Sequence, residues 1–191
     1  MTQQILQPYP AAWAGIENDT KQSGFTMSDP LTCSLLRTLA ASKPGGKFLE
    51  IGTGTGLSTA WILDGMDDDS ILISVDNDAA FQKIAERNLG FDKRLRLICA
   101  DGGEWLSANM LIKFDYIFAD SWHGKYLLLN AALQMLNKGG LYIIDDMLPQ
   151  PNWPEGHAEK AAALVDELEK KEGLFITKQN WATGIIIAVK K

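Results

Sequence analysis

Short hydrophobic runs alternate along most of the chain with longer stretches in which apolar residues recur every three or four positions. Runs of the first kind predict strands, and the longer stretches predict helices with one buried face. A first strand is expected to begin at Phe48. The further strands predicted in this part of the chain cover residues 71–75, 95–99, 116–119 and 141–144, and the helices cover residues 79–89 and 126–136. Alternating strands and helices indicate a parallel sheet covered on both faces.

The two ends of the chain depart from this alternation. A short helix is expected near the N-terminus, and Asp29 followed by Pro30 is typical of the start of a second helix. Near the C-terminus, a helix is predicted at residues 158–171, followed by strands at residues 174–179 and 185–189. Because only a tight connection joins these two strands, they should form an antiparallel pair.

A glycine-rich loop follows the first predicted strand. Gly52, Gly54 and Gly56 stand at alternate positions, and helical spacing resumes directly after them. Glycine lets a backbone turn sharply and lets a ligand approach without a Cβ in the way, and the next helix presents free N–H groups. The spacing differs from the G-x-G-x-x-G dinucleotide fingerprint. Glu50 would repel a pyrophosphate but suits a ligand with an ammonium group. A loop that merely connects two elements is the alternative.

The segment from Glu50 to Gly56 resembles the first motif of the class I S-adenosylmethionine-dependent methyltransferases, E/D-x-G-x-G-x-G. The resemblance implies a doubly wound, Rossmann-like α/β fold whose seven-stranded sheet ends in the C-terminal antiparallel hairpin. In such a sheet the ligand lies beyond the carboxyl ends of the strands. The residues predicted to bind S-adenosylmethionine are Glu50, Gly52, Gly54, Gly56, Ser58, Asp76, Asn77, Asp101, Gly102, Asp120 and Trp122.

Three of these residues have individual roles. Asp76 would accept hydrogen bonds from both ribose hydroxyls, although a dinucleotide enzyme would also place an acid there. The resemblance puts Asp101 near the adenine amino group, but Asp101 with Glu104 is equally typical of a capping box for the next helix. Trp122 would pack on the adenine or face the sulfonium cation.

Acidic residues follow two further predicted strands. Asp120 comes after the strand at residues 116–119, and Asp145 and Asp146 come after the strand at residues 141–144. If these strands are neighbours, three carboxylates converge, and a cation is needed because like charges raise each other's pKa. Such oxygen ligands suit magnesium or another divalent cation. A helix cap at Asp120 and a turn at Asp145 and Asp146 would explain the same residues without a metal.

Most of the chain resembles the cation-dependent O-methyltransferases of the catechol and caffeoyl-CoA type. The resemblance implies that Asp120 and Asp145 hold the metal, with Asp146 where the family has asparagine. The family's catalytic lysine falls at His123, while Lys125 stands out of register. His123 is therefore expected to accept the proton beside Asp120. The alternative is that His123 lies at the rim of the site and orients the substrate. A metal that lowers a phenol's pKa by about three units would supply roughly 4 kcal/mol towards forming the nucleophile. A homodimer is also expected from the resemblance.

Composition limits the kinds of partner. The 191 residues carry a net charge of -6, which disfavours nucleic acid because that partner calls for a basic face. No apolar run approaches the ~20 residues of a membrane span, and the N-terminus lacks the regions of a signal peptide, so a cytoplasmic protein is expected.

Cys33 and Cys99 form no metal or redox motif, and Cys99 is expected in the core. One domain is predicted over residues 1–191, with helices in residues 1–46 covering the site.

These observations predict an S-adenosylmethionine-dependent O-methyltransferase for a small hydroxylated, catechol-like molecule, assisted by a divalent cation. The proline-rich loop at residues 147–156 and residues 25–27 would wall the acceptor site, whereas His157 is expected at the surface. The alternatives are a metal-independent methyltransferase for another small acceptor, an NAD-dependent oxidoreductase and a non-catalytic cofactor-binding module. The glycine spacing, Glu50 and the terminal hairpin disfavour the oxidoreductase.

Overall fold

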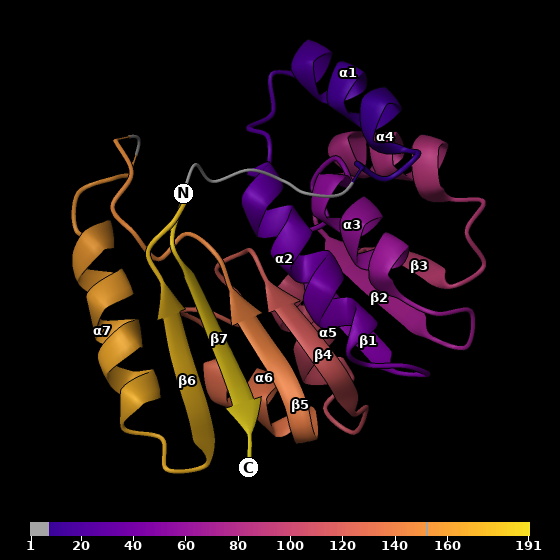
Figure 1. Cartoon of the computed structure of the whole chain (residues 1–191). Helices are drawn as coiled ribbons and strands as arrows, with labels where there is room; N and C mark the ends of the chain where they lie inside the picture. The colour runs from indigo at the N-terminus through magenta and orange to yellow at the C-terminus, as the bar shows by residue number, and fades with distance from the viewer. Residues whose placement is uncertain (1–7, 152) are drawn as a thin grey trace.

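The structure, a computed structural model, describes residues 8–151 and 153–191. Residues 1–7 and Asn152, on which parts of the N-terminal and loop predictions fall, lie outside the described residues. Seven strands form one sheet in the order β3-β2-β1-β4-β5-β7-β6 (Figure 1). The strands are β1 (Lys47–Ile51), β2 (Ile71–Asp76), β3 (Leu95–Cys99), β4 (Phe114–Ala119), β5 (Leu136–Ile144), β6 (Leu174–Gln179) and β7 (Ile185–Lys190).

Strands β1 to β5 pair in parallel, whereas β7 runs antiparallel to both β5 and β6. The chain therefore reverses its sheet order at β1 and β4, and this is where an open α/β sheet leaves a crevice for a ligand. The predicted doubly wound sheet with a C-terminal antiparallel hairpin is confirmed.

Helices cover both faces of the sheet (Figure 1). They are α1 (Trp13–Ser23), α2 (Pro30–Ala41), α3 (Leu57–Gly65), α4 (Ala79–Leu89), α5 (Gly102–Ala108), α6 (Leu129–Gln134) and α7 (His157–Glu169). Helices α1 to α4 contribute to one apolar core, and α5 to α7 contribute to a second core on the opposite face. Within the described ranges, no helix has both the length and the apolar character needed to cross a membrane.

The alternation of side chains along β1 places its acid on a particular face. Leu49 and Ile51 enter the core under α5 to α7, whereas Phe48 enters the core under α1 to α4. Because successive side chains of a strand point to opposite faces, Glu50 points with Phe48 towards α3. Strand β1 thus carries a carboxylate inward, against the helix that follows the glycine loop.

Two predictions about local structure are corrected. The helix expected at residues 126–136 is limited to α6, because Leu128 adopts a left-handed φ of 59° and β5 already begins at Leu136. Cys99 is exposed rather than in the core, because it ends β3, the strand at the edge of the sheet. The predicted start of α2 is confirmed, since Asp29 accepts hydrogen bonds from the backbone N–H groups of Leu31 and Thr32.

Candidate functional site

The loop between β1 and α3 brings the carboxyl ends of β1 and β4 into contact. Gly52 has a φ of 111°, and a Cβ at this position would lie 2.6 Å from the carbonyl oxygen of Asp120. A side chain is therefore excluded both by the backbone conformation and by the close approach of the next strand's end. Leu57 and Ser58, the first residues of α3, line the same hollow as the loop.

Glu50 lies behind this loop and is completely buried. Its carboxyl group accepts hydrogen bonds from Ser58 Oγ at 2.7 Å, Thr59 Oγ1 at 2.6 Å and Ser74 Oγ at 2.5 Å. Burial raises the pKa of Glu50 to about 7, although the three hydroxyl donors act in the opposite direction. From the sequence, Glu50 is expected to face the ammonium group of a ligand. In the structure, the carboxyl oxygens of Glu50 instead face hydroxyl groups of α3 and β2.

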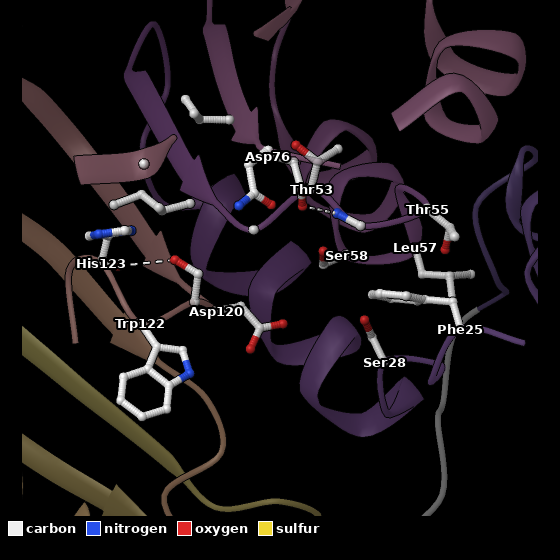
Figure 2. Close-up of a pocket in the computed structure, with 17 residues that line it drawn as sticks. Phe25, Ser28, Thr53, Thr55, Leu57, Ser58, Asp76, Asp120, Trp122 and His123 are labelled. Atoms are coloured by element: carbon white, nitrogen blue, oxygen red, sulfur yellow. Dashed lines mark hydrogen bonds between the residues drawn. The ribbon is translucent and has the colours of Figure 1, made fainter. Parts of the chain in front are cut away.

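A cavity of about 440 Å³ opens at the carboxyl ends of β1 and β2 (Figure 2). We call it the first cavity. The segment between α1 and α2 closes one side of it through Phe25 and Ser28. The predicted cofactor residues that line it are Gly52, Gly54, Ser58, Asp76, Asn77, Gly102, Asp120 and Trp122. Glu50, Gly56 and Asp101 are not among the residues that line it.

Asp76 joins β2 to the glycine loop. Its Oδ2 accepts a hydrogen bond from Gly54 N at 2.7 Å, and its Oδ1 accepts one from Asp78 N at 2.8 Å. An ionised carboxylate has about four acceptor sites. Asp76 can therefore hold the loop in place and still accept hydrogen bonds from a ligand in the first cavity.

Asp101 and His123 meet at the edge of the first cavity. Asp101 accepts hydrogen bonds from Gly103 N at 2.8 Å and Glu104 N at 3.0 Å, so the predicted cap of α5 is confirmed. His123 Nε2 lies 3.9 Å from Asp101 Oδ1, and a Cβ at Gly103 would be only 2.8 Å from the same nitrogen. The imidazole of His123 thus packs over the start of α5, on the side of the first cavity.

A second cavity of about 390 Å³ adjoins the first. Asp120, Ser121 and Trp122, three consecutive residues after β4, line both cavities. The second cavity is bounded further by Thr26, Lys125, Tyr126, Asp146, Gln150, Trp153, His157 and Thr183. Molecules bound in the two cavities would therefore meet at the carboxyl end of β4, beside Asp120.

Residues 49–147, just over half of the 191 residues, match a methyltransferase domain family. The chain belongs to this family. The match begins in β1 and ends just after β5, so it includes the glycine loop, Asp76 and the segment that joins the two cavities. The class I methyltransferase resemblance seen in the sequence is confirmed.

Curated relatives of this methyltransferase domain bear O-methyltransferase names. A protein of Mycolicibacterium smegmatis is 35% identical over 98 residues, which are 48% of this chain and 46% of the relative. A Mycobacterium tuberculosis protein is 33% identical over 113 residues, which are 56% of this chain and 50% of the relative. The chain thus spans about half the length of the curated relatives it matches.

Solved structures share the fold over nearly the whole chain. An O-methyltransferase from Bacillus cereus in complex with S-adenosylhomocysteine has a TM-score of 0.85 at 18% identity, covering 98% of this chain and 94% of that chain. The O-methyltransferase TomG from Streptomyces achromogenes, in complex with S-adenosylmethionine, has a TM-score of 0.81 at 19% identity. The likeness covers 98% of this chain and 92% of that chain. At these identities the likeness extends to the fold alone.

In the described part of the chain, no group of three His, Cys, Asp or Glu side chains placed to hold a metal ion is found. Asp145 is 6% exposed, and its Oδ1 already accepts hydrogen bonds from Thr183 Oγ1 at 2.5 Å and Asp146 N at 2.8 Å. The Asp120 carboxylate is 3.5 Å from the Lys125 ammonium. One oxygen of Asp120 and one oxygen of Asp145 therefore already have protein partners.

Asp120, which is 26% exposed, and the buried Asp145 nevertheless share an unusual electrostatic environment. Burial raises the pKa of Asp120 to about 7, opposed by the positive charge of Lys125 and reinforced by Asp145 and Asp146. Burial likewise raises the pKa of Asp145, while the hydrogen bond from Thr183 lowers it. Asp120 is therefore poised to exchange a proton near neutral pH, at the junction of the two cavities.

Thr26, Gln150 and Trp153 come from the two segments predicted to wall the acceptor site. The residues of the second cavity that have no place among the predicted site residues are Ser121, Lys125, Tyr126, His157 and Thr183. His157 is half-buried rather than at the surface, with Nε2 3.2 Å from the Tyr126 hydroxyl and its ring centroid 4.3 Å from that of Trp153. The aromatic run around Trp122 and the tryptophan of the proline-rich loop were the available signals. These aromatic side chains come together only because the start of α7 packs against the segment after β4.

Proposed function

We propose that this chain is an S-adenosylmethionine-dependent O-methyltransferase that methylates a hydroxyl group of a small acceptor. The observation that carries the proposal is the pair of cavities that meet at Asp120, Ser121 and Trp122. A methyl transfer needs a donor and an acceptor in line and almost in contact. In this proposal, the first cavity holds the donor and the second cavity holds the acceptor.

The first cavity offers groups suited to the parts of the donor. Asp76, already anchored to the glycine loop, would accept the ribose hydroxyls. Gly52 and Gly54 allow the backbone to approach the ligand closely, and the start of α3 supplies free N–H groups. Glu50 would act indirectly by fixing Ser58 and Thr59 on α3. The ligands named for the Bacillus cereus and Streptomyces achromogenes structures support this choice of donor.

The reacting hydroxyl would lie against Asp120. S-adenosylmethionine supplies an electrophilic methyl group. The acceptor oxygen forms a bond to that methyl carbon, while the bond to sulfur breaks and its electron pair stays on sulfur. The hydroxyl proton would pass to the Asp120 carboxylate, whose pKa of about 7 suits a general base near neutral pH. His123 lies on the donor side, so we assign it to the donor pocket rather than to this proton transfer.

The walls of the second cavity favour a flat acceptor. The Trp122 ring stands edge-on to the rings of Tyr126 and His157, with centroids 5.4 Å and 5.6 Å away. Such rings offer a planar ligand offset-stacked and edge-to-face contacts. The hydroxyl of Tyr126 adds a polar group that can orient a second substituent. A small hydroxylated ring, catechol-like in shape, therefore fits this proposal.

The divalent cation expected from the sequence is not part of this proposal, because the Lys125 ammonium already lies beside one oxygen of Asp120 and Thr183 already donates to one oxygen of Asp145. The homodimer and the assignment of residues 1–191 to one domain stay predictions.

The proposal is tested by incubating the purified chain with S-adenosylmethionine and a panel of catechols and simple phenols, and by measuring S-adenosylhomocysteine release and the mass of the acceptor. We expect a gain of one methyl group on oxygen. Binding of the donor with no turnover on any hydroxylated acceptor would contradict the assigned reaction and favour a non-catalytic module. The Asp120→Asn variant is the matched control, since it should bind the donor and fail to turn over.

A further inference from the structure

Lys125 is the buried cation of the second cavity. Its side chain is 5% exposed, and its Nζ lies 3.5 Å from Asp120 Oδ1. Asp146 lines the same cavity, and Asp145 is near enough that the positive charge of Lys125 lowers the pKa of its carboxyl group. Lysine is almost never fully buried unless its charge is paired. The placement therefore matches a positive charge to the acids that end β4 and β5.

A tight turn after β4 directs Lys125 into the site. Gly124 has a φ of 85°, its N–H donates to the carbonyl oxygen of Leu127 at 2.7 Å, and its own carbonyl accepts from the Tyr142 hydroxyl at 2.5 Å. Tyr126 N also donates to the carbonyl of Trp122 at 3.0 Å. The turn fixes Lys125 beside Asp120 and leaves His123 on the other side, over α5.

The position of Lys125 competes with a metal ion. A divalent cation bound through Asp120 Oδ1 and Asp145 Oδ1 would have to displace the Lys125 ammonium from the first acid and the Thr183 hydroxyl from the second. A divalent cation placed close to a fixed ammonium group would also be repelled. The acids thus already have a cation, and it belongs to the protein.

We propose that the Lys125 ammonium takes the place of a divalent cation at the acceptor site and stabilises the acceptor oxygen during methyl transfer, so that the reaction needs no metal. This inference rests on the proposed function. The oxygen forms its bond to the methyl carbon, the carbon–sulfur bond breaks with its electron pair going to sulfur, and the hydroxyl proton passes to Asp120. Lys125 keeps its protons throughout and donates a hydrogen bond to the oxygen.

Binding of Mn²⁺, followed by electron paramagnetic resonance, tests this inference without an acceptor. We expect the wild-type chain to bind Mn²⁺ weakly and the Lys125→Met variant to bind it about tenfold more tightly or better, because the competing charge is gone. The Lys178→Met variant is the matched control, since Lys178 pairs with Glu169 on the surface, at 2.6 Å. The proposal would be overturned if the wild type bound Mn²⁺ tightly and lost this binding in Asp145→Asn. It would also be overturned if the wild type and Lys125→Met bound Mn²⁺ equally weakly.

Turnover provides a second, independent readout. With catechol as the acceptor probe, methylation by the wild type should be unchanged after treatment with EDTA, and Lys125→Met should lower kcat about 100-fold or more with an unchanged Kd for S-adenosylhomocysteine. Lys125→Arg keeps the positive charge and should retain more activity than Lys125→Met. It also provides a test if the methionine variant does not fold. Loss of activity with EDTA and its return with Mg²⁺ would overturn the inference while leaving the proposed methyl transfer intact. Failure to bind S-adenosylhomocysteine would instead count against the proposed function.

Discussion

The phenyl ring of Phe25 lies so close to Gly54 that a Cβ at Gly54 would be 2.7 Å from the Phe25 Cζ. The same ring packs against Phe81 of α4, with ring centroids 4.6 Å apart. Phe25 and Thr26 are neighbours in the segment between α1 and α2, and they line the first and the second cavity respectively. This segment therefore forms part of the wall of both cavities.

The Gly54→Ala variant should lose binding of S-adenosylhomocysteine, about tenfold or more by isothermal titration calorimetry. The left-handed φ of 52° costs a non-glycine residue roughly 1–2 kcal/mol, and the new methyl group displaces Phe25. Gly45→Ala separates the two effects, because Gly45 has a φ of 64° and its new methyl group would meet nothing within 4 Å. That control should lose stability but keep its affinity, and equal affinities in both variants would contradict the role given to the loop.

Glu50 should make the stability of the chain depend on pH. Its pKa of about 7 in the folded chain lies above the ordinary 4.5, so its contribution to the free energy of unfolding is complete below about pH 4.5 and is lost as the pH rises through 7. The shift corresponds to about 3 kcal/mol. The free energy of unfolding should be measured with urea at several pH values. Between pH 4.5 and 8, the wild type should lose about 3 kcal/mol more of this free energy than Glu50→Gln does. If the free energy of unfolding depends on pH in the same way in both proteins, folding does not raise the pKa of Glu50 and its carboxyl group is ionised in the folded chain near neutral pH.

Turnover should follow the ionisation of Asp120. A general base must be deprotonated, so we expect kcat to rise with pH and to level off above about 7, the pKa that burial gives this carboxyl group. Asp120→Asn should lower kcat by roughly 10²–10⁴-fold and leave binding of S-adenosylhomocysteine nearly unchanged. A pH-independent kcat, or an active asparagine variant, would exclude Asp120 as the base.

His123→Ala should affect the donor rather than the chemistry. Since the imidazole packs against Gly103 and Asp101 beside the first cavity, its removal should weaken S-adenosylhomocysteine binding several-fold and leave kcat at saturating donor within about a factor of ten. If instead kcat collapses while donor affinity is kept, the base predicted from the sequence is the correct one.

Regular elements could be predicted from the sequence because their signals are local. Strand β3 and helix α4 have the predicted bounds, and the antiparallel pair at the C-terminus follows from the short connection between β6 and β7. The glycine loop was also readable, since alternate glycines allow backbone conformations and approaches that other residues resist. Asp76 and Trp122 could be placed at the first cavity because the carboxyl ends of parallel strands meet at one edge.

The acceptor side could not be predicted in the same way, because it depends on irregular backbone. Residues 122–127 form a turn held by Gly124 and Tyr142 instead of the start of a helix. That turn, and not sequence register, decides that Lys125 and not His123 approaches Asp120. Glu50 illustrates a second limit, since the position of an acid at a strand end does not reveal whether it faces a ligand or three buried hydroxyl groups.

The roles proposed for these residues all depend on a sulfonium donor binding in the first cavity. Isothermal titration calorimetry of the wild-type chain with S-adenosylhomocysteine, and separately with NAD, tests this most directly. We predict one S-adenosylhomocysteine bound per chain, with binding weakened by Asp76→Ala, and no measurable binding of NAD. Binding of NAD that is lost in the same variant, with none of S-adenosylhomocysteine, would contradict the proposed function.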